Sequence, residues 1–510
     1  MIEDPPPPRS LRPRSLLWPA IALVALMTMP AWVGLAVAAA VLTARFALRD
    51  IRHVRARDAE IAERAAGAVQ IGSDGRGRAV LVPEQTLAAH GLILGATGAG
   101  KSTTLLTLLS EQVRRGRPVV AIDLKGSPGF ATELRAAAEA AGRPFVQWTP
   151  DGGARWNPLA VGNATELKDK LLGTERFTEP HYRRAAERYL QMAIQVAQES
   201  APERTLTLAR VVELMAPERL AVATRRLPRA RSEYVRDYLT SLTPDQHSAI
   251  RGLASRLAVL TESHTGSYLE PAADAPAVDL RRALDGGEVV LFSLNSSTYG
   301  GLAGMLGTLA VQDLIAATGA RLSAGRGAEG LAVVAIDEFS ALGSDNVMAL
   351  LSRGREAGVG VLLATQELAD LDRAGRGLRD QVLGNTALKI AHRQDVPESA
   401  ATVARLAGTI RVWERSYQTR PGTRGFGGNV ATSARLVERY TIEPEQVRSL
   451  PTGEAIVIFK SPRAVALHAR IRRQPPSGRQ PPSGHQPPSG RQPPPGRQPD
   501  RQPPAPGVTR

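Results

Sequence analysis

A glycine-rich segment, residues 95–102, constrains the fold of this chain more than any other feature of the sequence. It reads Gly-Ala-Thr-Gly-Ala-Gly-Lys-Ser and matches the phosphate-binding loop pattern G-x-x-x-x-G-K-[ST]. The apolar run 91–94 before the loop predicts a strand, and the run 103–109 after it predicts a helix. This order of elements places backbone N–H groups and the positive end of a helix around a phosphate group. The motif therefore predicts a binding site for a nucleoside triphosphate.

The residue types within the loop indicate which atoms would contact the nucleotide. Glycines allow successive backbone N–H groups to point toward one phosphate. Lys101 would contact the β- and γ-phosphates, and the Ser102 hydroxyl would bind Mg²⁺. We therefore predict ATP and Mg²⁺ as ligands. The predicted nucleotide-binding residues are Gly95, Ala96, Thr97, Gly98, Ala99, Gly100, Lys101, Ser102 and Thr103.

Two carboxylates at the end of another apolar run supply groups that hydrolysis needs. Residues 331–336 are apolar and are followed by Asp337 and Glu338. Asp337 would orient Mg²⁺, directly or through water. Glu338 would be the general base that activates the attacking water. A nucleotide switch would not need the second carboxylate, so the pair favours hydrolysis over binding alone.

Two polar positions farther along the chain are further catalytic candidates. Residues 359–366 predict a buried strand that ends in Thr-Gln, and Gln366 at its tip would sense the γ-phosphate. Arg353 and Arg355 lie between the two predicted strands, and Arg355 would reach the γ-phosphate of a neighbouring subunit as an arginine finger. The sequence leaves structural roles open for both: a Gln bonded to a loop, and an Arg exposed on a helix.

The net charge of the 510-residue chain is +15, and most of the excess lies in its two flanks. Residues 1–57 carry eight Arg and three acidic residues, and residues 473–510 carry six Arg and one Asp, a net of +5 in each. Charge alone is therefore a weak argument for nucleic-acid binding. The absence of Cys from the sequence excludes disulfides, thiolate zinc sites and a Cys nucleophile. The eight His residues show no ligand-like spacing.

Residues 15–44 contain no charged residue and predict a membrane anchor. At ~1.5 Å per residue, the run exceeds the hydrocarbon core of about 30 Å. Arginines flank it on both sides, and Pro30 lies near its middle, which leaves one crossing and a tight hairpin both open. Basic flanks favour the cytoplasmic side, so we place the rest of the chain in the cytoplasm. A cleaved signal peptide is disfavoured by the length of the run.

Alternating strand and helix patterns predict an α/β fold, a RecA-like P-loop ATPase core with a mostly parallel sheet covered on both faces. Helical spacing replaces strand patterns over residues 165–263 and predicts an inserted all-helical domain. From residue 473 an Arg-Gln-Pro-Pro-Ser-Gly unit repeats, which predicts a disordered tail, with a partner-docking motif as the alternative. The predicted parts are the anchor 1–57, the core 58–164 (which starts with a charged connector over 58–75), the insertion 165–263, the second part of the core 264–472 and the tail 473–510.

As a set, these motifs resemble the TraG/TraD-type coupling ATPases of type IV secretion and conjugation, in the FtsK/HerA-type P-loop superfamily. The resemblance spans about residues 80–470, and its most discriminating parts are Asp-Leu-Lys-Gly at 123–126 and Trp-Asn-Pro-Leu at 156–159. It implies a membrane-anchored homo-hexameric ring that recruits single-stranded DNA with its relaxase, or another secreted protein, and moves it toward secretion-channel components with ATP. Here the membrane segment leaves no room for a sizeable extracytoplasmic domain.

Two other functions stay open at the level of sequence. An FtsK-like double-stranded DNA translocase resembles the stretch 356–366, but it would not be expected to carry the helical insertion. A secretion receptor that recruits protein cargo and uses ATP only to change shape is excluded by nothing in the sequence. No interleaving of aromatic and basic residues indicates a DNA surface, so the DNA prediction depends mainly on the resemblance.

Overall fold

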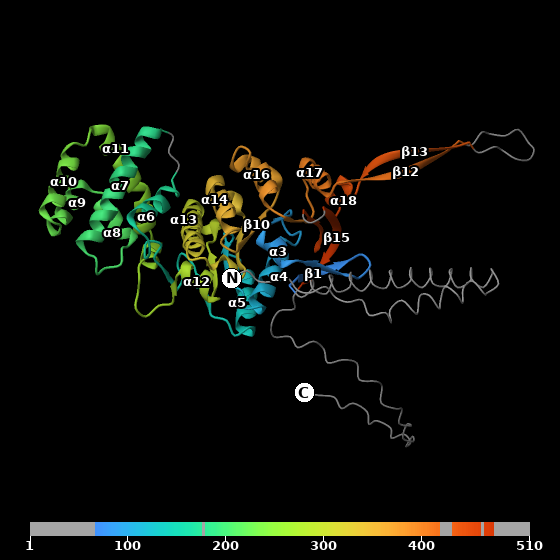
Figure 1. Ribbon diagram of the computed structural model, residues 1–510, viewed down its shortest axis with the longest axis horizontal. Helices are drawn as coiled ribbons and strands as arrows, with labels where there is room; N and C mark the ends of the chain where they lie inside the picture. Colours follow the sequence, from blue (N-terminus) through green and yellow to red (C-terminus); the bar gives the residue numbers. More distant parts are fainter. Residues whose placement is uncertain (1–66, 176–178, 419–430, 461–463, 474–510) are drawn as a thin grey trace, which may run out of the picture. The chain divides into compact units, whose positions relative to one another are not determined.

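The structure is a computed structural model that describes residues 67–175, 179–418, 431–460 and 464–473. The predicted membrane anchor at 15–44 and the repeat tail from residue 474 lie outside the described residues. The described part, drawn as a ribbon in Figure 1, is built around one sheet. This sheet has eleven strands in the order β2-β1-β15-β14-β11-β3-β10-β9-β4-β8-β5. Its strands are β1 Val69–Asp74, β2 Ala79–Val82, β3 Gly91–Leu94, β4 Val119–Asp123, β5 Phe145–Trp148, β8 Val289–Ser293, β9 Ala332–Asp337, β10 Val359–Thr365, β11 Leu388–Ala391, β14 Glu454–Phe459 and β15 Val465–Ile471.

The sheet is parallel from β11 through β5 and antiparallel from β14 to β2, which confirms a mostly parallel sheet. Every residue of β3, β4, β9 and β10 is buried, as expected for strands covered on both faces. Alternate residues join different hydrophobic clusters: Val334 and Ile336 pack on one face, and Val333 and Ala335 on the other. The central strands are therefore fixed from both sides.

The antiparallel edge contains one element that the sequence reasoning assigned wrongly. Residues 69–74 fall inside the segment 58–75 that we predict as a charged connector, but they form β1. Val69 and Ile71 are fully buried, and the strand pairs with β15 and β2. The alternation covers too few positions to stand out from the charged sequence around it.

Helices connect the strands of the sheet, and one of them is unusually long and apolar. These helices are α3 Glu84–Ala88, α4 Lys101–Arg114, α5 Pro128–Ala140, α12 Leu280–Gly286, α13 Ser296–Ser323, α14 Ser344–Gly354, α15 Leu368–Ala374, α16 Leu378–Asn385, α17 Pro397–Ala407 and α18 Pro444–Arg448. Among the described residues, α13 alone could span a membrane by length and composition. More than half of its apolar window is buried inside the protein, and Leu306, Leu309 and Leu314 are fully covered. We therefore interpret α13 as a core helix.

A run of six α-helices lies between two short strands, β6 (Arg155–Trp156) and β7 (Ala277–Val278). The helices are α6 Ala164–Leu172, α7 Pro180–Ser200, α8 Leu208–Leu214, α9 Pro217–Ala223, α10 Arg229–Thr240 and α11 Pro244–Glu262. Capping boxes at Asn163 and Thr243 set the starts of α6 and α11. β6 and β7 pair in parallel, so the chain enters and leaves this helical segment at neighbouring positions.

A ribbon of two ten-residue strands, β12 (Thr409–Gln418) and β13 (Ala431–Tyr440), forms a sheet of its own (Figure 1). Trp413 pairs with Leu436 across the ribbon and is 67% exposed. This ribbon was not predicted. None of its side chains over residues 409–414 and 434–440 is buried, so these residues form no apolar stripe of the kind that packs on a core.

The strand register brings four chain segments to one edge of the sheet. Leu94 of β3 lies beside Thr365 of β10, and Asp337 of β9 lies between Ala364 of β10 and Asp123 of β4. These positions are the carboxyl ends of adjacent parallel strands, where α/β proteins bind ligands. The segments that follow the four strands therefore meet there, and they include the glycine-rich loop, Gln366 and Glu338.

Candidate nucleotide-binding site

The glycine-rich loop runs from Gly95 to Gly100, between β3 and α4, and Lys101, Ser102 and Thr103 form the first turn of α4. Gly98 and Gly100 have φ angles of +76° and +119°, a region that residues with a side chain rarely adopt. A Cβ at Gly95 would lie 2.8 Å from the Cβ of His392. Glycine is therefore required at Gly95 by close approach and at the other two positions by backbone conformation.

Lys101, the first residue of α4, directs its side chain back to the loop. Its side chain is buried, and its ammonium donates to the Gly95 carbonyl at 3.2 Å. Burial lowers the pKa of Lys101, and the positive charge of Lys125 acts in the same direction. The loop therefore curves around a desolvated cation at the N-terminus of a 14-residue helix. That arrangement favours an anion.

A buried histidine supports the loop from the neighbouring strands. His392 follows β11, its Nδ1 lies 2.8 Å from the Glu454 carbonyl, and its Nε2 lies 2.8 Å from the Thr104 hydroxyl. A carbonyl only accepts, so Nδ1 carries the proton and Nε2 accepts from Thr104. Burial lowers the pKa of His392 to about 4, which leaves the ring neutral near pH 7. No motif distinguishes this histidine in the sequence, so its supporting role was missed.

Two buried aspartates lie side by side at the strand ends. Asp123 and Asp337 are register partners on β4 and β9, and both are nearly inaccessible to solvent. Burial raises the pKa of Asp123 to about 6, and the charge of Asp337 adds to that shift. Burial also raises the pKa of Asp337, against the opposing charges of Lys125 and Lys101. The pair concentrates negative charge where a cation is predicted.

Glu338 is the first residue after β9 and has a left-handed backbone conformation, with φ +57°. Its Oε1 accepts from Gln366 Nε2 at 2.7 Å and lies 2.9 Å from Lys125 Nζ. Thr97 of the loop donates to Gln366 Oε1 at 3.2 Å. Burial alone would raise the pKa of Glu338, but the contacts from Gln366 and Lys125 outweigh it, and the net effect is a lowered pKa. The structure thus brings together Thr97, Gln366 and Glu338 from three separate motifs.

Lys125 is a second site residue, after His392, that the sequence reasoning did not single out. It lies in the Asp-Leu-Lys-Gly segment after β4, where the Asp123 carboxylate accepts from the backbone N–H groups of Lys125 (2.9 Å) and Ser127 (2.7 Å). Gly126 has a φ of +66°, and a Cβ there would lie 2.7 Å from Asn295. The turn therefore fixes the direction in which Lys125 leaves the backbone. Only the adjacency of β4 and β9 reveals that this direction leads to Glu338.

Arg355 lies away from these groups. It follows α14 and precedes the start of β10, at the amino end of the sheet. Burial is the main cause that lowers the pKa of His90 to about 4, and the charge of Arg355 contributes, which places Arg355 near the residue that precedes β3. The phosphate loop lies at the opposite, carboxyl ends of β3 and β10. The described conformation therefore does not bring Arg355 to the phosphate loop of the same chain.

A cavity of about 390 Å³ opens beside Glu338. Glu338, Ser340, Thr365, Gln366, Asp370 and Arg373 line it, and Asp370 and Arg373 form an ion pair. The general-base candidate is thus open to water on this side, although its side chain is only 23% exposed.

The donors and acceptors at this edge fit a magnesium nucleotide. The loop supplies left-handed glycines, the start of a helix and a buried lysine for phosphates, and Asp337 and Ser102 are oxygen donors of the kind that Mg²⁺ prefers. In the described part of the chain, no group of three or more His, Asp or Glu side chains could hold a metal by itself. The residues therefore suit an ion that keeps phosphate and water ligands, as Mg²⁺ does.

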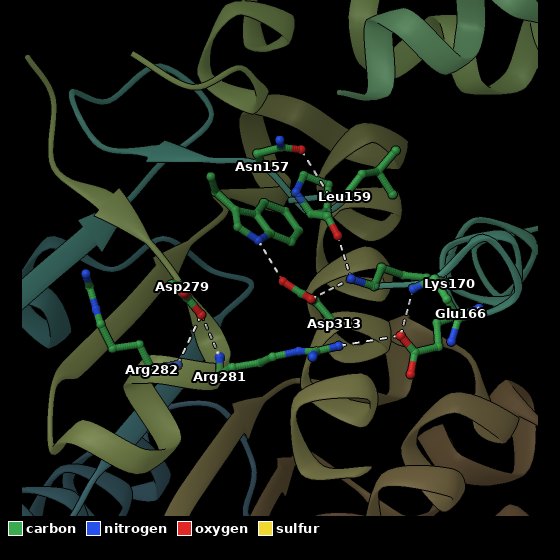
Figure 2. Close-up of polar contacts among 11 residues, drawn as sticks. Asn157, Leu159, Glu166, Lys170, Asp279, Arg281, Arg282 and Asp313 are labelled. Atoms are coloured by element: carbon green, nitrogen blue, oxygen red, sulfur yellow. Dashed lines mark hydrogen bonds and ion pairs between the residues drawn. The ribbon is translucent and has the colours of Figure 1, made fainter. Parts of the chain in front are cut away.

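The Trp-Asn-Pro-Leu motif makes its contacts at a different place, between the helical segment and the core (Figure 2). Trp156 Nε1 donates to Asp313 Oδ2 of α13 at 3.0 Å, and Lys170 Nζ of α6 lies 2.7 Å from Asp313 Oδ1. Lys170 also donates to the Pro158 carbonyl, and Asn157 donates to the Leu206 carbonyl at 2.9 Å. The motif therefore joins α6 and the chain before α8 to the core helix α13.

The fold and the site define the chain as a P-loop ATPase. Comparisons with known proteins agree: residues 50–118, which contain the glycine-rich loop, match the model of the FtsK/SpoIIIE family. Residues 332–452, which contain Asp337, Glu338 and Gln366, match the model of the TraM recognition site of TraD and TraG. These matches confirm the predicted resemblance to TraG/TraD-like, FtsK-type coupling ATPases.

Solved structures of two other proteins share the fold. The unbound bacterial conjugative coupling protein TrwBΔN70 has a TM-score of 0.59 at 17% identity, over 81% of this chain and 90% of that chain. TrwB in complex with the non-hydrolysable ATP analogue ADPNP has a TM-score of 0.58 at 17% identity, over 81% and 91%. VirB4 of Thermoanaerobacter pseudethanolicus has a TM-score of 0.53 at 16% identity, over 81% and 98%. No curated protein sequence matches the chain.

Proposed function

We propose that this chain is a membrane-anchored coupling ATPase that recruits DNA, with its bound protein, and moves it to a type IV secretion or conjugation apparatus. The observation that carries the proposal is Glu338, which is bonded to Gln366 and Lys125 beside a phosphate-binding loop. The residues that make this site fall in the two segments that match the FtsK/SpoIIIE and TraD/TraG models, apart from Asp123 and Lys125. ATP and Mg²⁺ are its proposed ligands.

The side chains divide the chemistry of hydrolysis among them. Lys101 and the loop N–H groups would hold the phosphates, and Ser102 and Asp337 would hold Mg²⁺, which when bound would neutralise phosphate charge. Glu338 takes a proton from water, whose oxygen bonds to the γ-phosphorus as the bond to the bridging oxygen breaks. Gln366 orients Glu338 by a hydrogen bond, and its bond from Thr97 connects Glu338 to the phosphate loop. The pair Asp337–Glu338 thereby separates metal binding from proton transfer.

The remaining parts of the chain extend the proposal beyond the site. Residues 1–57 would anchor the protein in the membrane with the ATPase domain in the cytoplasm, and residues 165–263 would form a separate helical domain. Arg355, remote from its own loop, would act on the site of a neighbouring subunit. A contact of that kind is head-to-tail and forms a ring when the rotation between subunits closes, and we propose a closed homo-hexamer around single-stranded DNA.

ATP hydrolysis by the full-length protein in detergent tests the DNA assignment. We expect single-stranded DNA to raise the rate, with a stimulation that weakens steeply as salt increases. Preferential stimulation by duplex DNA would favour an FtsK-like translocase instead. Stimulation by neither nucleic acid, in a preparation whose basal activity requires Lys101, would favour a receptor for protein cargo.

Mixed oligomers test whether Arg355 acts between subunits. Arg355→Ala and Lys101→Ala subunits are each expected to be nearly inactive alone. A mixture should recover part of the activity, because some interfaces pair an intact loop with an intact arginine. Arg353→Ala is the matched control and should stay active, since Arg353, in the last turn of α14 and two residues before Arg355, is an exposed arginine too. Full activity of Arg355→Ala would contradict the finger assignment.

A further inference from the structure

Two lysines from different loops converge on the carboxylates of the nucleotide site. Lys101 comes from α4 and Lys125 from the turn after β4. The two are close enough for the positive charge of Lys125 to lower the pKa of Lys101. Lys125 Nζ lies 2.9 Å from Glu338 Oε1. Phosphate-binding loops require one of these lysines. The second lysine needs an explanation of its own.

The position of Lys125 is set by its surroundings. The Asp123 carboxylate holds the backbone of the turn through two N–H groups, and the left-handed Gly126 packs against Asn295. The Ser296 N–H also donates to the Leu124 carbonyl at 2.7 Å. The turn therefore has a fixed shape, whereas the lysine side chain beyond it is 35% exposed and can move.

The contact between Lys125 and Glu338 suits an exchange of partners. Glu338 already accepts a 2.7 Å hydrogen bond from Gln366 on the same oxygen, so it stays positioned when Lys125 leaves. Partly exposed lysine–carboxylate pairs contribute little net free energy. A γ-phosphate carries more negative charge than one carboxylate and offers more acceptor oxygens, so it competes effectively for an ammonium. While Lys125 occupies Oε1, that oxygen is less available to a water molecule.

We propose that Lys125 is a second phosphate-contacting lysine, which pairs with Glu338 when the γ-phosphate position is empty and transfers to the γ-phosphate when ATP binds. After the transfer, Glu338 keeps its hydrogen bond from Gln366, and its carboxylate is available to the attacking water. ADP lacks the γ-phosphate, so with ADP bound Lys125 stays on Glu338. The inference rests on the proposed nucleotide site and adds to it a group that distinguishes ATP from ADP.

Equilibrium binding of nucleotides, with no turnover, tests the exchange. The Mg²⁺ complexes of ADP and of a non-hydrolysable ATP analogue are titrated into full-length wild type, Lys125→Gln, Glu338→Gln and the double variant. Lys125→Gln should weaken binding of the analogue about tenfold or more, because a charge-assisted contact is lost, and should change ADP binding less than about twofold. Glu338→Gln should strengthen binding of the analogue, because it frees Lys125. The double variant should not show that gain.

Three controls make the result decisive. Lys125→Arg keeps the positive charge and should retain more of the preference for the analogue than Lys125→Gln does. Lys101→Ala should no longer bind ADP or the ATP analogue. If it bound both normally, the proposed nucleotide site would be wrong, and the proposed exchange of Lys125 would be wrong as well. If Lys101→Ala loses both nucleotides while Lys125→Gln binds them normally, or weakens both equally, the site stands and the exchange is overturned. A gain in the double variant equal to that of Glu338→Gln would also overturn it.

Discussion

Two lysine–carboxylate pairs in this protein have similar geometry and different surroundings. Lys125 and Glu338, at the phosphate loop, are 2.9 Å apart with side chains 35% and 23% exposed. Lys170 and Asp313, at the junction between α6 and α13, are 2.7 Å apart and 2% and 17% exposed. The Lys170 ammonium also donates to Pro158, and the second oxygen of Asp313 accepts from Trp156.

The difference lies in what each lysine could do after leaving its carboxylate. Lys125 can exchange its partner for water or for another anion, because solvent reaches it. Lys170 has no such alternative without leaving a charge buried, which is costly. The same residue types therefore support a movable contact at the nucleotide site and a fixed joint at the helical segment.

The largest effect concerns the groups around Lys125. Lys101→Ala should lose nucleotide affinity as well as turnover, because it removes the charge on the β- and γ-phosphates. Glu338→Gln should bind nucleotide but hydrolyse it about 10²–10⁴-fold more slowly, because only the general base is lost. Steady-state ATP hydrolysis combined with equilibrium binding separates the two. Equal loss of ATP binding in both variants would contradict these roles.

The next effect concerns the fixed joint. Lys170→Met leaves Asp313 partly buried without its cation, so the free energy of unfolding should fall by about 3–5 kcal/mol. Chemical denaturation of the full-length variant measures the change. Lys168→Met is the matched control on the same helix: Lys168 pairs with Asp169 and Glu187, both more exposed than Asp313, and should cost about 1 kcal/mol or less. Equal costs for the two variants would remove the distinction that we draw.

The nucleotide site also contains buried groups that make stability depend on pH. His392 has its pKa lowered to about 4, so unfolding takes up a proton between pH 4 and 6.5, and this contribution to stability falls as pH falls. Asp123 has its pKa raised to about 6, so unfolding releases a proton between pH 3.8 and 6, and its contribution falls as pH rises. The two oppose each other. Asp123→Asn should therefore steepen the loss of stability on acidification, by up to ~1.4 kcal/mol per pH unit.

Urea denaturation at several pH values between 4 and 7 measures this slope for both proteins. Subtracting the wild-type profile from that of Asp123→Asn removes the contributions of the other titrating groups. Parallel profiles would show that Asp123 titrates normally in the folded protein.

The smallest expected effect is on the stability of the movable pair. Lys125→Gln should change the free energy of unfolding by less than about 1 kcal/mol in the absence of nucleotide, because the pair is partly exposed. The measurement is the same denaturation experiment as for Lys170→Met. A loss as large as that of Lys170→Met would mean that Lys125 is a structural residue.

The site residues that sequence could identify are those defined by local pattern. The phosphate loop is contiguous, and Glu338 and Gln366 each end an apolar strand, so residue order alone places them at one edge of a parallel sheet. Lys125 is marked by no local pattern as general as the phosphate loop or a polar residue at the end of an apolar strand. Its role depends on β4 lying next to β9, and strand order is a property of the whole fold.

The same reasoning explains which elements were predicted. Long helices such as α7 and α11 carry a sustained apolar period, and the central strands are continuous apolar runs. β1 offers only Val69 and Ile71 before the sequence turns polar, and the β12–β13 ribbon has exposed apolar residues on strands with little burial. Period-based prediction therefore fails where an element is short or has no buried face.

The parallel pairing of β6 with β7 has a consequence for how such proteins diversify. Because Arg155 lies beside Ala277 and Trp156 beside Val278, the two attachment points of the helical segment are already held together without it. Helices between α7 and α11 can then be lengthened, shortened or exchanged as a cassette while the nucleotide site keeps its shape, as is usual for insertions with adjacent ends. Any such exchange must keep a cation at the position of Lys170 in α6, because Asp313 of the core helix α13 is paired with it. An exchange of this kind needs two breakpoints that lie far apart in the gene but encode neighbouring positions of the folded chain.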